Sequence, residues 1–70
     1  MEMSSTSQYD AKNDIKYAKE MIPHHQMAIE MSEKVIKTGL SSEIDKFARK
    51  VIETQSKEIQ FLRDWLKKNA

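Results

Sequence analysis

The sequence predicts an all-α protein, an antiparallel hairpin of two helices. Charged residues make up 33% of the chain and hydrophobic residues 39%, with one glycine and one proline, which is typical of a helical domain. Apolar residues recur every three or four positions through two long segments. One short break, at residues 38–42, separates the segments, and so short a connection makes the helices antiparallel neighbours.

The first helix is expected over about residues 11–38, within a helical unit spanning residues 10–69. Its apolar positions keep a helical spacing and form a wide stripe. They are Ile15, Ala18, Met21, Ile22, Ala28, Ile29, Val35 and Ile36. Residues 1–9 are polar and without helical periodicity, so they are expected to form a disordered or loosely docked N-terminal segment.

The turn is expected at about residues 39–41 and the second helix over about residues 42–68. Gly39 is expected to adopt a left-handed conformation, with Leu40 folding back on the last turn, and Ser41 or Ser42 to cap the second helix. The apolar positions of that helix again form a stripe. They are Ile44, Phe47, Ala48, Val51, Ile52, Ile59, Leu62, Trp65 and Leu66.

Two helices share a single seam, which leaves half of each wide apolar stripe in contact with water. Pairing two hairpins into a four-helix bundle would cover both stripes. We therefore expect a homodimer.

The charge and hydropathy patterns exclude several partners. The net charge is +1 and no basic stripe with interleaved aromatic residues occurs, so nucleic acid is not expected to bind. The apolar runs are too short for membrane insertion. Since no apolar signal region occurs at the N-terminus, the chain is expected either to stay in the cytoplasm or to be a mature or trimmed form.

Residues 21–31 concentrate the chemistry, with both histidines, the proline and three of the five methionines. His24, Met27 and Met31 have the spacing i, i+3, i+7 and line one edge of the helix, with Met21 and His25 nearby. Thioether and imidazole groups favour Cu(I) or Ag(I), whereas Cu(II) would depend on the imidazoles. This pattern predicts a soft-metal site for copper or silver.

A purely structural alternative stays open. His25 falls near the centre of the apolar stripe, and Gln55 lies at the same level of the second helix, with Glu58 about one turn further from the loop. Such residues can form a buried polar layer that fixes the register of a dimeric bundle. An enzyme is not expected, because the Glu-x-x-His pairs of di-iron bundles are missing and the second helix has no histidine.

Two stretches of the chain also resemble a known family. They are the string Met-Ile-Pro-His-His-Gln-x-Ala-Ile-x-Met of residues 21–31, and Ile52-x-x-Gln55-x-x-Glu58-Ile59 with Trp65-Leu66. Together they resemble the family called domain of unknown function 305, a ferritin-like helical family. The resemblance covers about residues 14–66, and many members contain two copies of this unit.

The resemblance implies a helical bundle, commonly secreted, periplasmic or surface-attached, with some members similar to periplasmic copper-binding proteins. The metal-binding positions that it implies here are Met21, His24, His25 and Met31. Met27 stands where the family often has glycine or a polar residue, and Leu62 where methionine is frequent. The expected function is binding of copper or silver for storage, tolerance or transfer, with an unidentified donor or acceptor protein.

Overall fold

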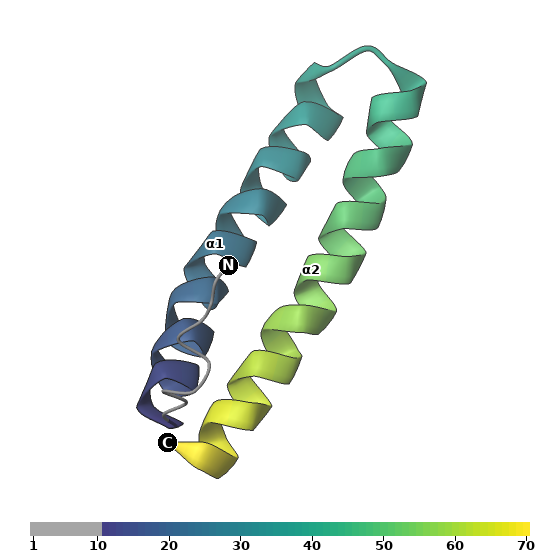
Figure 1. Cartoon of the computed structure of the whole chain (residues 1–70). Coiled ribbons are helices and arrows are strands. Elements are labelled where there is room, and N and C mark those ends of the chain that lie inside the picture. Colours follow the sequence, from purple (N-terminus) through teal and green to yellow (C-terminus); the bar gives the residue numbers. More distant parts are fainter. Residues whose placement is uncertain (1–10) are drawn as a thin grey trace, which may run out of the picture.

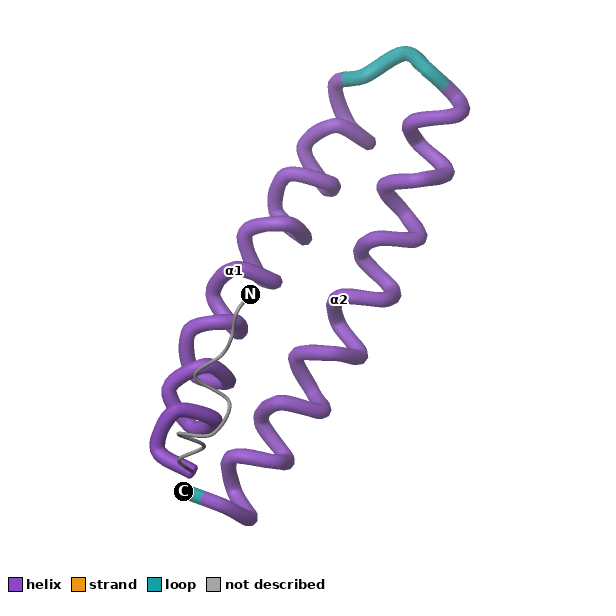
Figure 2. The backbone as a smooth tube through the Cα atoms, in the orientation of Figure 1, coloured by secondary structure: helices purple, strands orange, loops and turns teal. Residues whose placement is uncertain are grey.

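The structure is a computed structural model that describes residues 11–70, so the predicted N-terminal segment, residues 1–9, lies outside the described residues. It consists of two helices of equal length, α1 (Ala11–Thr38) and α2 (Ser42–Asn69). They lie side by side and antiparallel, with the start of α1 and the end of α2 at the same end of the molecule (Figures 1 and 2). The predicted all-α hairpin is confirmed.

The turn between the helices is built differently from the prediction. No described residue has a positive φ, so Gly39 is not left-handed, and Leu40 is fully exposed instead of folding back. The Gly39 N–H donates to the Val35 carbonyl at 2.7 Å, which continues the helical hydrogen bonding. A Cβ at residue 39 would lie 2.8 Å from that same oxygen. Glycine is thus favoured by this close approach rather than by its backbone angle.

Ser41 caps the N-terminus of α2. Its backbone is extended, and its hydroxyl oxygen accepts a hydrogen bond from the Ile44 N–H at 3.2 Å. This is an N-cap, which satisfies one of the free donors of the first turn. At the other end of α2, the Ala70 N–H donates to the Leu66 carbonyl at 2.8 Å.

The outer face of α2 carries local ion pairs. Arg49 donates to Asp45 at 2.8 Å, and the hydrogen bond and the negative charge of Asp45 raise the pKa of Arg49. Glu53 lies 3.4 Å from the ammonium of Lys57. Such exposed pairs contribute little to stability but keep this face polar. Neither of the two described helices is long and apolar enough to cross a membrane.

The buried residues at the seam between the helices are mostly small or polar. On α1 they are Ala18, His25 and Ser32, which are seven residues apart, and on α2 they are Ala48 and the larger Ile59. Small side chains let the two backbones approach closely. No side chain among the described residues is completely buried, and the Cα atoms extend only 13 Å in the thinnest direction. The hairpin is therefore a single layer of helices without an interior of its own.

Candidate functional site

His25 is the centre of the candidate site. It lies in the middle of α1, only 8% exposed, and its imidazole bridges the two helices. Nδ1 lies 3.0 Å from the carbonyl oxygen of Met21, one turn earlier on α1, and Nε2 lies 2.6 Å from Oε1 of Glu58 on α2. Both ring nitrogens are thus within hydrogen-bond distance of a partner, as a buried imidazole requires.

These contacts fix the orientation of the ring. A carbonyl oxygen can only accept, so Nδ1 of His25 carries a hydrogen and donates it to Met21. Nε2 is then the nitrogen that faces the Glu58 carboxylate, to which it donates when the ring is fully protonated. In the neutral ring, Nε2 holds the lone pair and is the atom that a metal would bind, beside a carboxylate oxygen.

A shallow groove of about 230 Å³ gives access to this pair. Met21, His25 and Glu58 line it, together with three apolar side chains at its end nearer the chain termini. Met21 is half-buried there, and the side chain of Glu58 is 52% exposed. Of the predicted metal ligands, the structure therefore brings Met21 and His25 into one groove, with Glu58 as an added oxygen donor.

The other predicted ligands lie outside that groove. His24 is exposed, and Met27 and Met31 are 57% and 66% exposed. These three residues follow one another along one side of α1, at the spacing that makes helical neighbours. Met31 also lines a second groove of about 390 Å³ nearer the loop, between Ala28 and Phe47. The five predicted ligands thus form an exposed set of three and a half-buried pair.

Pro23 lies inside α1, immediately before the two histidines, and is exposed. Proline has no N–H, so the Lys19 carbonyl loses the helical hydrogen bond that residue 23 would donate. An additional backbone acceptor is therefore left on α1 one turn before the histidines.

The polar partner of His25 is Glu58, whereas the sequence interpretation placed Gln55 opposite it. Gln55 is half-buried, and the contacts of His25 are with Met21 and Glu58 instead. Side chains of a helix point towards its N-terminus, and the His25 imidazole is directed back along α1 to Met21. It therefore reaches Glu58, which was expected about one turn further from the loop than Gln55. His25 and Glu58 are therefore the bonded pair among the three residues of the predicted polar layer.

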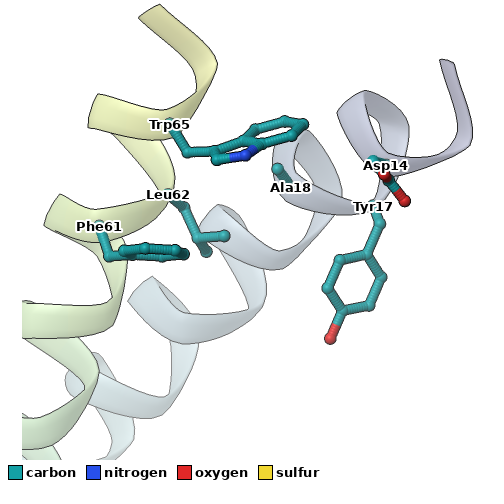
Figure 3. Close-up of a pocket in the computed structure, with 6 residues that line it drawn as sticks. All are labelled: Asp14, Tyr17, Ala18, Phe61, Leu62 and Trp65. Atoms are coloured by element: carbon teal, nitrogen blue, oxygen red, sulfur yellow. The ribbon is translucent and has the colours of Figure 1, made fainter. Parts of the chain in front are cut away.

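Sequence reasoning missed two aromatic residues, Tyr17 and Phe61. They line a third groove, of about 260 Å³, at the end of the hairpin near the termini. Figure 3 shows the rings of Phe61 and Trp65 extending from α2 towards α1, where Ala18 leaves space for the indole. Tyr17 is seven residues before His24, and Phe61 is fourteen after Phe47, so a search for heptad spacing would have found both.

The donor set of the site suits a soft metal better than a hard one. Imidazole nitrogens and thioether sulfurs are ligands of Cu(I) and Ag(I). Zinc and harder cations need more nitrogen, thiolate or carboxylate ligands, and the described residues contain no group of three or more such side chains placed to hold one ion. The donor types that α1 carries, imidazole and thioether, are those that Cu(I) and Ag(I) prefer.

The fold and the site together define a small all-α hairpin with a histidine-methionine segment in its first helix. Residues 3–70 match the family described as Domain of unknown function (DUF305), and the chain belongs to that family. No curated protein and no solved structure shows significant similarity to the chain.

Proposed function

We propose that this protein is a soft-metal-binding module that binds Cu(I) or Ag(I) through the methionines and histidines of α1, for storage, tolerance or transfer of the metal. The observation that carries the proposal is the exposure of Met27, which is 57% exposed and lines none of the three grooves. Methionine usually fills an apolar core. The thioether of Met27, beside the exposed His24, has no comparable packing role and is accessible to an ion.

Five side chains have separate parts in this proposal. His24, Met27 and Met31 are the exposed ligands on one side of α1. Met21 is the more protected thioether, in the groove that also contains Nε2 of His25. The absence of cysteine from the sequence leaves thioethers as the sulfur donors, and because these are neutral they favour monovalent ions.

Titration of the full chain with Cu(I), against a competing chelator, and with Ag(I) tests the proposal. Saturable binding tighter than micromolar is expected in the parent, weakened by His24→Ala and by Met31→Leu. Leucine keeps the apolar volume of methionine and removes the sulfur, so a loss with Met31→Leu is due to the donor atom. Absence of binding tighter than micromolar in the parent would exclude the function.

A second candidate is a structural or protein-interaction role, in which the histidines serve packing alone. The contacts of His25 favour it, since Nδ1 and Nε2 are both engaged with protein groups at 3.0 and 2.6 Å. A buried polar pair of this kind can fix the register of helices. The same titration separates the two candidates, because a purely structural chain binds neither ion.

In both cases we propose that the chain acts as a homodimer, two hairpins forming a four-helix bundle. The hairpin is a single layer in which no described side chain is completely buried, and small domains need a shared core when they lack one. The mass of the chain in solution tests this.

A further inference from the structure

We infer that the grooved face of the hairpin is the surface that docks the second copy, and that the two His25–Glu58 pairs meet at the centre of the dimer. The grooved face is the side on which the three grooves open, and its exposed large apolar side chains are Tyr17, Met31, Ile44, Phe47 and Phe61. This inference rests on the homodimer proposed above and specifies its interface.

The distribution of exposed apolar side chains identifies the face. Seven large hydrophobic residues are exposed among the described residues, and five of them line the three grooves. The remaining two are Met27, on the side of α1, and Leu40, in the turn. Large apolar patches on one side of a small protein mark an interaction surface. The outer face of α2 carries the ion pairs of Arg49 and of Glu53 with Lys57 instead.

Heptad spacing arranges the face in rows. Tyr17, His24 and Met31 follow one another at intervals of seven along the edge of α1, and residues 47, 54 and 61 do so along the edge of α2. Seven residues correspond to about 10.5 Å along a helix, and residues so spaced keep to one side of it. Each row therefore has a large apolar residue at both ends and a polar residue in the middle.

This arrangement makes the face complementary to itself. One apolar cluster, with Tyr17 and Phe61, lies towards the termini, and the other, with Met31 and Phe47, lies about as far from the centre towards the loop. A two-fold axis in the interface places apolar on apolar whether it runs along the helices or across them. In either arrangement the central polar level of one copy faces that of the other.

The area of the face is of the size that a stable dimer needs. Between Asp14 and Val35 it is roughly 30 Å long at 1.5 Å per residue, and two adjacent helices make it roughly 20 Å wide. The projected area is then roughly 600 Å², and the uneven surface of the side chains makes the accessible area larger than this. A standard interface buries about 800 Å² of accessible surface per partner. A short segment of another protein would cover only part of it, whereas a second hairpin matches its length.

The central level would then contain the polar groups of both copies. In one chain, His25 and Glu58 form a pair, Glu58 half in contact with water at the floor of its groove. Docking removes that water and brings the His25–Glu58 pairs of the two copies next to each other. His24 and Thr54 then lie at the edges of this polar level. Burying these groups favours arrangements in which the polar levels coincide. The layer therefore sets the register of the dimer.

Light scattering and sedimentation equilibrium of the full chain in a chelating buffer test the interface without metal. The parent is expected at twice the 8.2 kDa of one chain. Phe47→Glu and Phe61→Glu are expected to lower the mass to that of one chain at the same concentration, whether or not the separated chains stay helical. Leu40→Glu, an equal change at a fully exposed position outside the face, should leave the dimer intact.

A monomeric parent would overturn the homodimer itself. A dimeric parent whose mass is unchanged by Phe47→Glu and Phe61→Glu would overturn the assignment of the face and leave the homodimer standing. Neither result depends on copper or silver binding, so failure of the interface and failure of the metal proposal are distinguishable.

Spin-label distances test the central level, since the sequence has no cysteine of its own. Thr54→Cys places a label on the grooved face near the centre, and Glu53→Cys places one at the same height on the outer surface. The distance between protomers, from pulsed electron paramagnetic resonance, is expected to be shorter for the label at residue 54. A distance equal to or longer than that for residue 53 would contradict the docking mode.

Discussion

Nε2 of His25 lies 2.6 Å from Oε1 of Glu58, and this contact joins the middle of α1 to α2. The pair is asymmetric in burial, since the His25 side chain is 10% exposed and that of Glu58 52%. The carboxylate keeps much of its hydration, while the imidazole depends on its protein partners. Losing the contact therefore harms the histidine more than the glutamate.

Removing Glu58 is expected to destabilise the hairpin through its effect on His25. Glu58→Ala should lower the free energy of unfolding by about 1 kcal/mol, because Nε2 of the imidazole loses its partner in a mostly buried position. Glu58→Gln should cost less, since the amide can still pair with the ring. Urea unfolding at one fixed protein concentration measures both.

The control for this prediction is Glu53→Ala, an exposed glutamate on the outer face whose carboxylate pairs only with neighbouring lysines of α2. It should change stability by at most about 0.5 kcal/mol. In a double-mutant cycle, His25→Ala should remove most of the effect of Glu58→Ala. If the two effects simply add, the contact contributes nothing.

Ser41 is expected to stabilise the start of α2. Its hydroxyl accepts from the Ile44 N–H at 3.2 Å, and Ser41→Ala leaves that N–H without its capping partner. A loss of about 1 kcal/mol is expected in the free energy of unfolding. Ser42→Ala, one residue later and inside the helix, is the matched control and should be close to neutral. Equal effects of the two substitutions would contradict the cap.

Gly39 is expected to resist substitution although its φ is not positive. Glycine-to-alanine changes at ordinary backbone angles usually stabilise by about 0.4–1 kcal/mol, through the unfolded chain. Here the new Cβ would lie 2.8 Å from the Val35 carbonyl oxygen, a backbone atom that cannot move aside easily. We expect the contact to dominate, with Gly39→Ala lowering stability by about 1 kcal/mol. Thermal unfolding of Gly39→Ala measures this loss, with Leu40→Ala at an exposed position as the control. A gain in stability in Gly39→Ala would refute the prediction.

The hairpin could be predicted from the sequence because its signals are local. Helical periodicity needs only neighbouring residues, and the break at Gly39 and Ser41 separates two long periodic stretches. The backbone angle of Gly39 could not be predicted, since a glycine after a helix is compatible with several conformations. Its actual role depends on the distance to the Val35 carbonyl, which only the folded turn defines.

The candidate site could be predicted only in part, for a related reason. The spacing of His24, Met27 and Met31 follows from one helix, and their exposure agrees with their place on the wheel. The pairing of His25 with Glu58 depends on the direction of the imidazole, which its hydrogen bond to the Met21 carbonyl sets and no spacing pattern contains. The sequence interpretation placed Glu58 in the polar layer but expected Gln55, at the level of His25, as the bonding partner.

Ala48 is expected to be intolerant of larger side chains. It is 3% exposed, in the contact between the two helices. Ala48→Leu inserts three carbon atoms into that contact and should lower stability by about 1–3 kcal/mol. Ala28→Leu is the matched control: both alanines border the 390 Å³ groove, but Ala28 is only half-buried, so a larger side chain there can extend towards solvent. Unfolding in urea should therefore separate the two variants, and equal losses would contradict a destabilisation that depends on the burial of Ala48.

Met27 is expected to matter for metal binding and not for folding. It is 57% exposed and lines none of the three grooves described above, so Met27→Leu should change stability by less than about 0.5 kcal/mol. Loss of its sulfur should weaken Ag(I) binding by about tenfold or more, which corresponds to about 1.4 kcal/mol. Leu40→Met is the control, since it adds an exposed thioether in the turn, away from the histidines, and should not strengthen binding. Isothermal titration of both variants decides whether placement of the sulfur on α1, rather than methionine content, determines affinity. An unchanged affinity in Met27→Leu would remove this residue from the proposed ligands.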